Sequence, residues 1–175
     1  KKPDFKDSSW KQVTLPHAFN EDEAFRISIE QHTDTVVWYR KHFVVPAETK
    51  GQRVSIHFEA AMGKQILYLN GKRIQEHIGG YLPFTLDLTT YGVQAGDSCL
   101  LAVFVDNSDD KSYPPGKRQY TLDFTYHGGI YRDVWMIAKS PISITDAIES
   151  QTVAGGGVFV PVSYTHLRAL ETSAH

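Results

Sequence analysis

Residues 65–77 read QILYLNGKRIQEH, and this stretch contains the strongest turn signal in the chain. Asn70 and Gly71 separate two short runs that contain Ile, Leu and Tyr. An Asn-Gly pair accepts the positive φ angles of a two-residue type I′ turn, which joins antiparallel strands. The segment therefore predicts a β-hairpin with arms at residues 66–69 and 74–77.

Similar strand patterns lie on both sides of this hairpin. In residues 53–59, Val54, Ile56 and Phe58 alternate with polar residues, as in a strand buried on one face. The run 99–105 is continuously apolar and predicts a central strand buried on both faces. Further strands are predicted at residues 36–45, 84–88, 130–138 and 142–148. About eight short strands and no convincing helix before residue 150 are typical of an all-β sandwich or barrel.

Charge, hydropathy and cysteine content exclude several partners and sites. The 175 residues carry 18 basic and 20 acidic side chains, so the net charge of −2 predicts no nucleic-acid partner. No apolar run reaches the roughly 20 residues of a membrane span, and no signal peptide is visible. Cys99 is the only cysteine, which excludes an internal disulfide and a cysteine-based zinc site. We interpret Cys99 as a small buried hydrophobic residue.

Most motifs of catalysis are missing from the sequence. The eight histidines show no His-x-His or i, i+4 pair suited to a metal, and there is no Gly-x-Ser-x-Gly or phosphate-binding loop. Residues 109–119 form a long polar loop, and long loops are often functional. Its neighbouring carboxylates show no sign of an acid and nucleophile pair, and we interpret them as solvated loop acids. They are Asp106, Asp109, Asp110 and Asp123.

Aromatic side chains near this loop offer a different chemistry. Sugars stack their C–H faces on aromatic rings, while their hydroxyls need Asp, Asn or Arg partners. Asp123 and Asn107 beside a tyrosine would suit a sugar. The competing interpretation is that half of the nearby rings belong to the core. The rings are Tyr81, Tyr113, Tyr120, Phe124, Tyr126 and Tyr131.

A series of short motifs resembles the N-terminal domain of glycoside hydrolase family 2 and, within it, that of bacterial β-galactosidases. The resemblance covers about residues 9–160, and the ordered set is specific although each piece alone is weak. The motifs are Leu15-Pro16-His17, Trp38-Tyr39-Arg40, Phe58-Glu59, Tyr68-Leu69-Asn70-Gly71-Lys72, Gly79-Gly80-Tyr81, Val105-Asp106-Asn107, Pro114-Pro115-Gly116, Leu122-Asp123-Phe124 and Gly128-Gly129-Ile130-Tyr131-Arg132-Asp133-Val134.

The resemblance implies a fold and a domain organisation. We expect a jelly-roll β-sandwich like that of galactose-binding domains over residues 1–150, with about eight or nine strands. In the family an immunoglobulin-like domain and a TIM barrel follow. Residues 151–162 are expected to be a linker and the first strand of that second domain, at Val158-Phe159-Val160. Residues 163–175 resemble translated adapter sequence and are set aside.

The resemblance also implies a function. The catalytic pair of glutamates lies in the barrel of these retaining hydrolases, so we expect no catalytic residue, cofactor or metal in this chain and no activity from it alone. Any metal of the complete enzyme is expected outside it. The expected partners are a β-galactoside, reached through the complete enzyme, and the enzyme's own further domains. The sequence leaves open a homo-oligomer and a bacterial cytoplasmic or periplasmic location.

Site residues are carried over from the family only where the motifs match. The loop before Gly128 faces the barrel mouth in the family, which suggests Asp123, Phe124, Tyr126 and Asn107 as substrate-side residues. The competing interpretation is that Asp123 caps the turn before Gly128-Gly129. Two other functions stay open, namely a stand-alone carbohydrate-binding module and a structural sandwich without a sugar site. The sequence does not separate β-galactosidase from β-glucuronidase or β-mannosidase, which differ in the barrel pocket.

Overall fold

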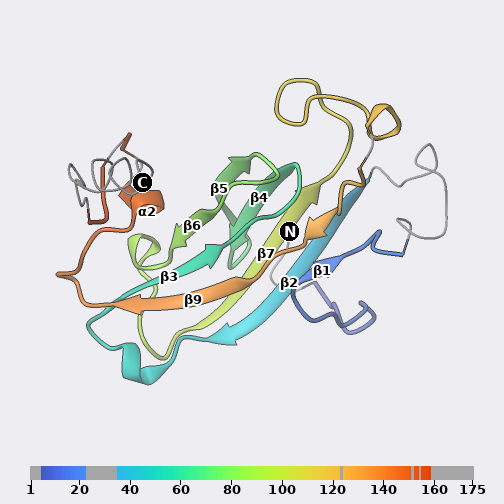
Figure 1. Cartoon of the computed structure of the whole chain (residues 1–175). Coiled ribbons are helices and arrows are strands. Elements are labelled where there is room, and N and C mark those ends of the chain that lie inside the picture. Colours follow the sequence, from blue (N-terminus) through green and yellow to red (C-terminus); the bar gives the residue numbers. More distant parts are fainter. Residues whose placement is uncertain (1–4, 23–34, 123, 151, 154, 159–175) are drawn as a thin grey trace, which may run out of the picture. The chain divides into compact units, whose positions relative to one another are not determined.

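A computed structural model describes residues 5–22, 35–122, 124–150, 152–153 and 155–158 (Figure 1). The chain divides into two compact units between Ile142 and Ser143. The first unit holds all the strands of the described residues. The described part of the second holds one short helix, α2 (Ala147–Ser150).

In its described residues, the first unit has nine antiparallel strands, joined by turns and three short 3-10 helices. The 3-10 helices are η2 (Ala47–Thr49), η3 (Thr89–Tyr91) and η4 (Gln119–Thr121). The strands are β1 (His17–Ala18), β2 (Val36–Val44), β3 (Arg53–Phe58), β4 (Lys64–Leu69), β5 (Lys72–Ile78), β6 (Phe84–Asp87), β7 (Ser98–Asp106), β8 (Gly129–Ile130) and β9 (Val134–Lys139).

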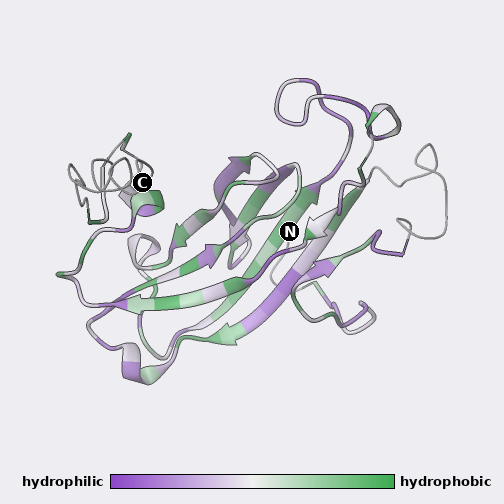
Figure 2. Cartoon of the chain, viewed as in Figure 1, coloured by the Kyte–Doolittle hydropathy of each residue, from purple (hydrophilic) through white to green (hydrophobic). Residues whose placement is uncertain are grey.

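The strands form two main sheets that pack face to face, as expected for a sandwich. One sheet has the order β2-β7-β4-β5 and the other β6-β3-β9, while β1 and β8 form a short separate pair. Side chains from both inner faces make one core, which includes Phe58, Leu67, Leu86 and Val103. Apolar and polar residues alternate along β3, which puts its apolar residues on the inner face (Figure 2). The expected all-β jelly-roll sandwich is therefore confirmed.

Strand β7 owes its apolar sequence to its central place. It pairs with β2 on one side and β4 on the other. Residues 99–103 are all buried, and Cys99 is only 4% exposed. Burial raises the pKa of the Cys99 thiol and keeps it neutral. The predicted central strand and the structural role of Cys99 are both confirmed.

The predicted hairpin is present between β4 and β5. Leu69 pairs with Lys72, so the turn has two residues, and Asn70 and Gly71 have φ angles of 48° and 83°. The Asn70 side chain adds a long-range contact, because its Oδ1 accepts a hydrogen bond of 2.8 Å from the Leu100 backbone N–H. This bond ties the turn to the central strand β7.

We expect Gly71→Val to lower the free energy of unfolding by about 1 kcal/mol or more, since a β-branched residue is strained at positive φ. A urea or guanidinium melt of the purified chain measures the change. Gly92→Ala, at a φ of 78° outside the hairpin, separates the general cost of positive φ from the cost of branching. An unchanged midpoint in Gly71→Val would contradict the importance of this turn.

Two strand predictions need correction. Residues 142–148 form no strand: Ile142 and Ile144 are 92% and 68% exposed, and Asp146 Oδ1 accepts the Ile148 backbone N–H at 2.8 Å, which caps α2 instead. The stretch 130–138 is not one strand but β8 and β9, separated by residues 131–133. There the Asp133 carbonyl accepts a hydrogen bond from the Glu59 backbone N–H.

Other expectations fall partly outside the described residues. Two of the three residues in the proposed second-domain strand at residues 158–160 lie outside the described residues. The tail 163–175 lies wholly outside the described residues. Within the part of the chain that the structure describes, no helix is both long and apolar enough to cross a membrane.

Candidate functional site

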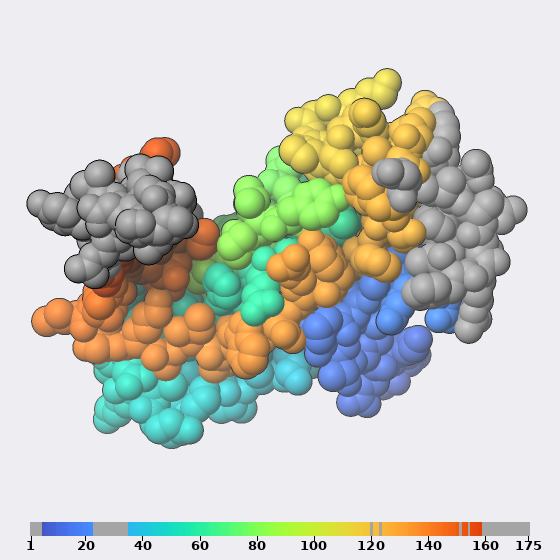
Figure 3. All heavy atoms as spheres, in the orientation of Figure 1, coloured from blue at the N-terminus to red at the C-terminus, as the bar shows by residue number. Residues whose placement is uncertain are grey.

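Two loops meet at one end of the sandwich. The first, residues 79–83, joins β5 to β6, and the second, residues 107–128, joins β7 to β8. The Tyr131 hydroxyl, just after the second loop, donates a 2.5 Å hydrogen bond to the Gly80 carbonyl of the first. In Figure 3 the yellow atoms of the second loop stand out from the surface beside the green atoms of the first. We call this surface the loop end.

Asn107 lies at the base of the loop end, directly after β7. Its backbone N–H donates to the Thr35 carbonyl at 2.9 Å, and its side chain is only 2% exposed. Neither its Nδ2 nor its Oδ1 has a hydrogen-bond partner among the described residues. An unpaired buried amide costs about 1–3 kcal/mol. No described residue therefore satisfies the Asn107 amide.

Gly128 is packed directly against Asn107. A Cβ at position 128 would lie 2.6 Å from Asn107 Nδ2 and would overlap the ring of Phe19. Glycine is thus required here because two side chains occupy the space that a larger residue would need. The next residue, Gly129, has a positive φ of 109°, so the pair combines close packing with an unusual turn of the backbone.

Tyr126 and Phe124 face different environments. Tyr126 is 4% exposed, and its hydroxyl donates to the Lys117 carbonyl at 3.1 Å, so it holds the loop together. Phe124 is 47% exposed, and its ring centroid lies 5.7 Å from that of Tyr126. Of the expected site residues, Phe124 is thus the ring available to a ligand, and Tyr126 supports it.

The pKa of Tyr126 is raised to about 12 by burial and, to a smaller extent, by Tyr81 and Asp109. The pKa of Tyr126 is near 10 in the unfolded chain and higher in the folded chain. Its contribution to stability is therefore fully present below pH 10 and is lost as the pH rises toward 12.

We expect Tyr126→Phe to lower the free energy of unfolding by about 1 kcal/mol at pH 8, because the hydrogen bond to Lys117 is missing. Between pH 10 and 12 we expect the free energy of unfolding to fall less in this variant than in the wild type. Thermal melts across this pH range measure both effects. Tyr91→Phe, which removes another hydroxyl bond to a backbone carbonyl, is the matched control. A parallel alkaline decline in wild type and Tyr126→Phe would show that Tyr126 is not responsible.

The candidate site also includes Tyr81, one of the rings that the sequence indicated, and two amides that the sequence did not indicate. Tyr81 is 44% exposed, and burial and the neighbouring Tyr131 raise its pKa. Gln119 is 3% exposed, and both of its side-chain polar atoms lack a partner among the described residues. Asn20, far away in the sequence, binds the backbone of the second loop. No sequence signal marked Asn20 or Gln119, because an isolated amide has no motif, and Asp123 lies outside the described residues.

Several histidines and carboxylates of the described residues have structural contacts instead. His17 Nδ1 and the Tyr39 hydroxyl are hydrogen-bonded at 2.9 Å, and the His77 ring stacks on Phe84 at 4.3 Å. Glu59 accepts a bond of 3.0 Å from the indole N–H of Trp135. The residues that the structure describes contain no group of three or more His, Cys, Asp or Glu able to hold a metal.

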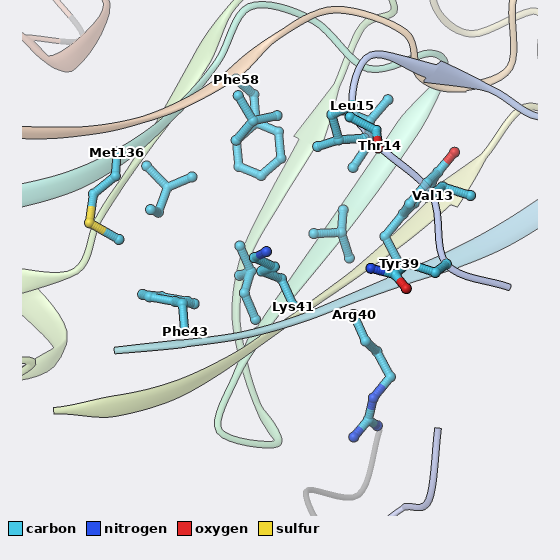
Figure 4. A pocket seen from close by; sticks show the side chains of 15 residues that line it. Val13, Thr14, Leu15, Tyr39, Arg40, Lys41, Phe43, Phe58 and Met136 are labelled. Atoms are coloured by element: carbon cyan, nitrogen blue, oxygen red, sulfur yellow. The ribbon is translucent and has the colours of Figure 1, made fainter. Parts of the chain in front are cut away.

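A cavity of about 490 Å³ lies where the edge strands β2 and β9 leave the sandwich open (Figure 4). Its lining is mainly apolar and includes Leu15, Phe43, Phe58 and Met136. Lys41 also lines it and is exposed. A charge on the inward row of an edge strand discourages pairing with other chains. We therefore interpret this cavity as the margin of the core.

Comparisons with known proteins agree with the fold and with the motifs. A β-galactosidase of Thermoanaerobacter pseudethanolicus is 39% identical over 143 residues, which are 82% of this chain and 19% of that protein. A β-glucuronidase of Formosa agariphila is 31% identical over 154 residues, or 81% of this chain and 15% of that protein. The crystal structure of a Bacteroides uniformis β-glucuronidase has a TM-score of 0.68 at 33% identity, covering 78% of this chain and 15% of that one.

The chain thus spans less than a fifth of the length of these relatives. The family model for "Glycosyl hydrolases family 2, sugar binding domain" matches residues 4–141. Since this match covers most of the 175 residues and includes every strand described, the chain belongs to glycoside hydrolase family 2, within its sugar-binding domain.

Proposed function

We propose that this chain is the N-terminal, non-catalytic domain of a β-galactosidase that cleaves terminal β-galactosides, and that its loop end forms one wall of the substrate pocket. The observation that carries this proposal is the buried amide of Asn107, whose polar atoms are unpaired, in the same loop end as the exposed ring of Phe124. A sugar needs both features, because its hydroxyls require polar partners and its C–H face stacks on a ring. The higher identity to a β-galactosidase than to a β-glucuronidase supports the choice of sugar.

In this proposal the domain binds and orients, and the barrel performs the chemistry. Asn107 would bond sugar hydroxyls, Phe124 would stack on the ring, and Asp123 would bind a hydroxyl directly or through an ion. No cofactor is proposed within this chain, and any metal ion of the complete enzyme is proposed to lie outside it. The proposed partners are the enzyme's own further domains and a second copy of the enzyme in a homo-oligomer.

The experiment compares the chain of 175 residues with the longer enzyme that carries it. We expect the longer enzyme to hydrolyse p-nitrophenyl β-galactoside with a higher kcat/KM than p-nitrophenyl β-glucuronide. The chain alone is expected to hydrolyse neither, because the proposed catalytic glutamates lie in the barrel. Turnover by the purified chain that disappears in Glu59→Gln or Asp106→Asn would contradict the proposal.

Two other measurements separate the competing function. A stand-alone carbohydrate-binding module would bind methyl β-galactoside without a hydrolase domain encoded in the same gene. A β-galactosidase domain instead requires the barrel in the same polypeptide. Sequencing the complete gene together with calorimetry on the chain alone distinguishes these two cases.

A further inference from the structure

Asn20 is a fully buried side chain that joins the N-terminal segment to the second loop of the loop end. It follows β1 and is 1% exposed. Its Nδ2 donates to the Tyr126 carbonyl at 2.7 Å, and its Oδ1 accepts from the Gly128 backbone N–H at 2.8 Å. Both bonds reach across more than 100 residues of sequence, and together they fix the loop backbone from residue 126 to 128.

These two bonds continue a strand pairing beyond its end. Strands β1 and β8 pair only at His17 with Ile130 and at Ala18 with Gly129. The Phe19 backbone N–H then donates to the Gly128 carbonyl at 3.0 Å. At the next residue the Asn20 side chain replaces the backbone as the hydrogen-bonding partner. The amide has one donor group and one acceptor, so it can satisfy a carbonyl and an N–H of the opposite segment together.

The backbone that Asn20 holds carries the proposed substrate-side residues. Tyr126 supports the exposed ring of Phe124 two residues earlier. Gly128 packs against the Asn107 amide. A shift of this segment would therefore move the ring and change the space around Asn107 together.

We propose that Asn20 is a positioning residue for the substrate pocket: it sets the place of Phe124 and the access to Asn107 without touching the sugar. This inference rests on the proposed function of the loop end. Its physical basis is that binding groups must be held within a fraction of an ångström by a rigid surrounding. An amide that bonds both partners in a buried place provides such rigidity.

The test is Asn20→Ala in the longer enzyme, with steady-state kinetics on p-nitrophenyl β-galactoside at a temperature where every variant is folded. We expect KM to rise about tenfold and kcat to change less than twofold, since the domain binds sugar away from the cleaved bond. The matched control is Asn70→Ala, which removes another amide that bonds the backbone, at Leu100. Asn70 lies about 20 Å along the strands from Asn107, so the KM of the Asn70→Ala enzyme should stay within twofold of the wild-type value.

Equal changes of KM in both variants, or an unchanged KM in Asn20→Ala, would overturn the inference. If Asn20→Ala does not fold, Asn20→Asp keeps the acceptor for Gly128 and removes the donor to Tyr126. We expect this variant to raise KM about tenfold while the Gly128 amide hydrogen stays slow to exchange in the chain of 175 residues. An unchanged KM in Asn20→Asp would equally overturn the inference.

Failure of the proposed function has a different signature. If the proposed function is wrong, Phe124→Ala leaves the KM of the longer enzyme unchanged, as the Asn20 variants do, or the wild-type enzyme does not cleave the β-galactoside. The inference about Asn20 fails alone when Phe124→Ala raises KM and both Asn20 variants do not.

Discussion

Gly63→Ala is expected to abolish cooperative folding or to lower the free energy of unfolding by about 3 kcal/mol or more. Gly63 has a φ of 72°, and a Cβ at this position would overlap the backbone carbonyl oxygen of Asp106. Backbone atoms of a paired strand cannot move aside as a flexible side chain can, so β4 and β7 would have to separate where Lys64 pairs with Asp106.

Gly51→Ala is the matched control for this substitution. Gly51 has a similar φ of 77°, but nothing lies within 4 Å of the Cβ that alanine would add. Its cost is therefore the backbone strain alone, about 1 kcal/mol. Circular dichroism melts of the two variants measure the difference. Similar melting temperatures would show that the contact with Asp106 adjusts easily and that the close approach does not matter.

Asn107→Leu is expected to remove binding without weakening the fold. The Asn107 amide is buried and has no partner among the described residues, so an apolar side chain of similar volume removes a desolvation cost. We expect the melting temperature of the chain to stay level or to rise. In the longer enzyme we expect kcat/KM for p-nitrophenyl β-galactoside to fall by one decade or more, which is about 1.4 kcal/mol per decade.

Asn20→Leu provides the contrast in stability. Asn20 is equally buried, but both of its polar groups are bonded, so the same substitution should lower the melting temperature clearly. If Asn107→Leu also lowers the melting temperature and leaves the kinetics of the folded enzyme normal, Asn107 is a structural residue and the proposed site is wrong.

The sequence determined most of the strands and one turn, because these depend on local patterns. The alternation of Val54, Ile56 and Phe58 matches β3, and the apolar run of residues 99–105 lies within the central strand β7. Asn70 and Gly71 predicted their hairpin because only a few residues accept positive φ angles. The ordered motifs through Gly128-Gly129-Ile130 also identified the family.

Tertiary structure decided the features that depend on distant residues. The apolar pattern of residues 142–148 predicted a strand, yet the side chain of Asp146 caps a short helix there. The unpaired state of Asn107, the supporting role of Tyr126 and the two bonds of Asn20 were equally invisible in the sequence. A hydrogen bond across more than 100 residues leaves no local pattern, because only the folded sheets bring its donor and acceptor together.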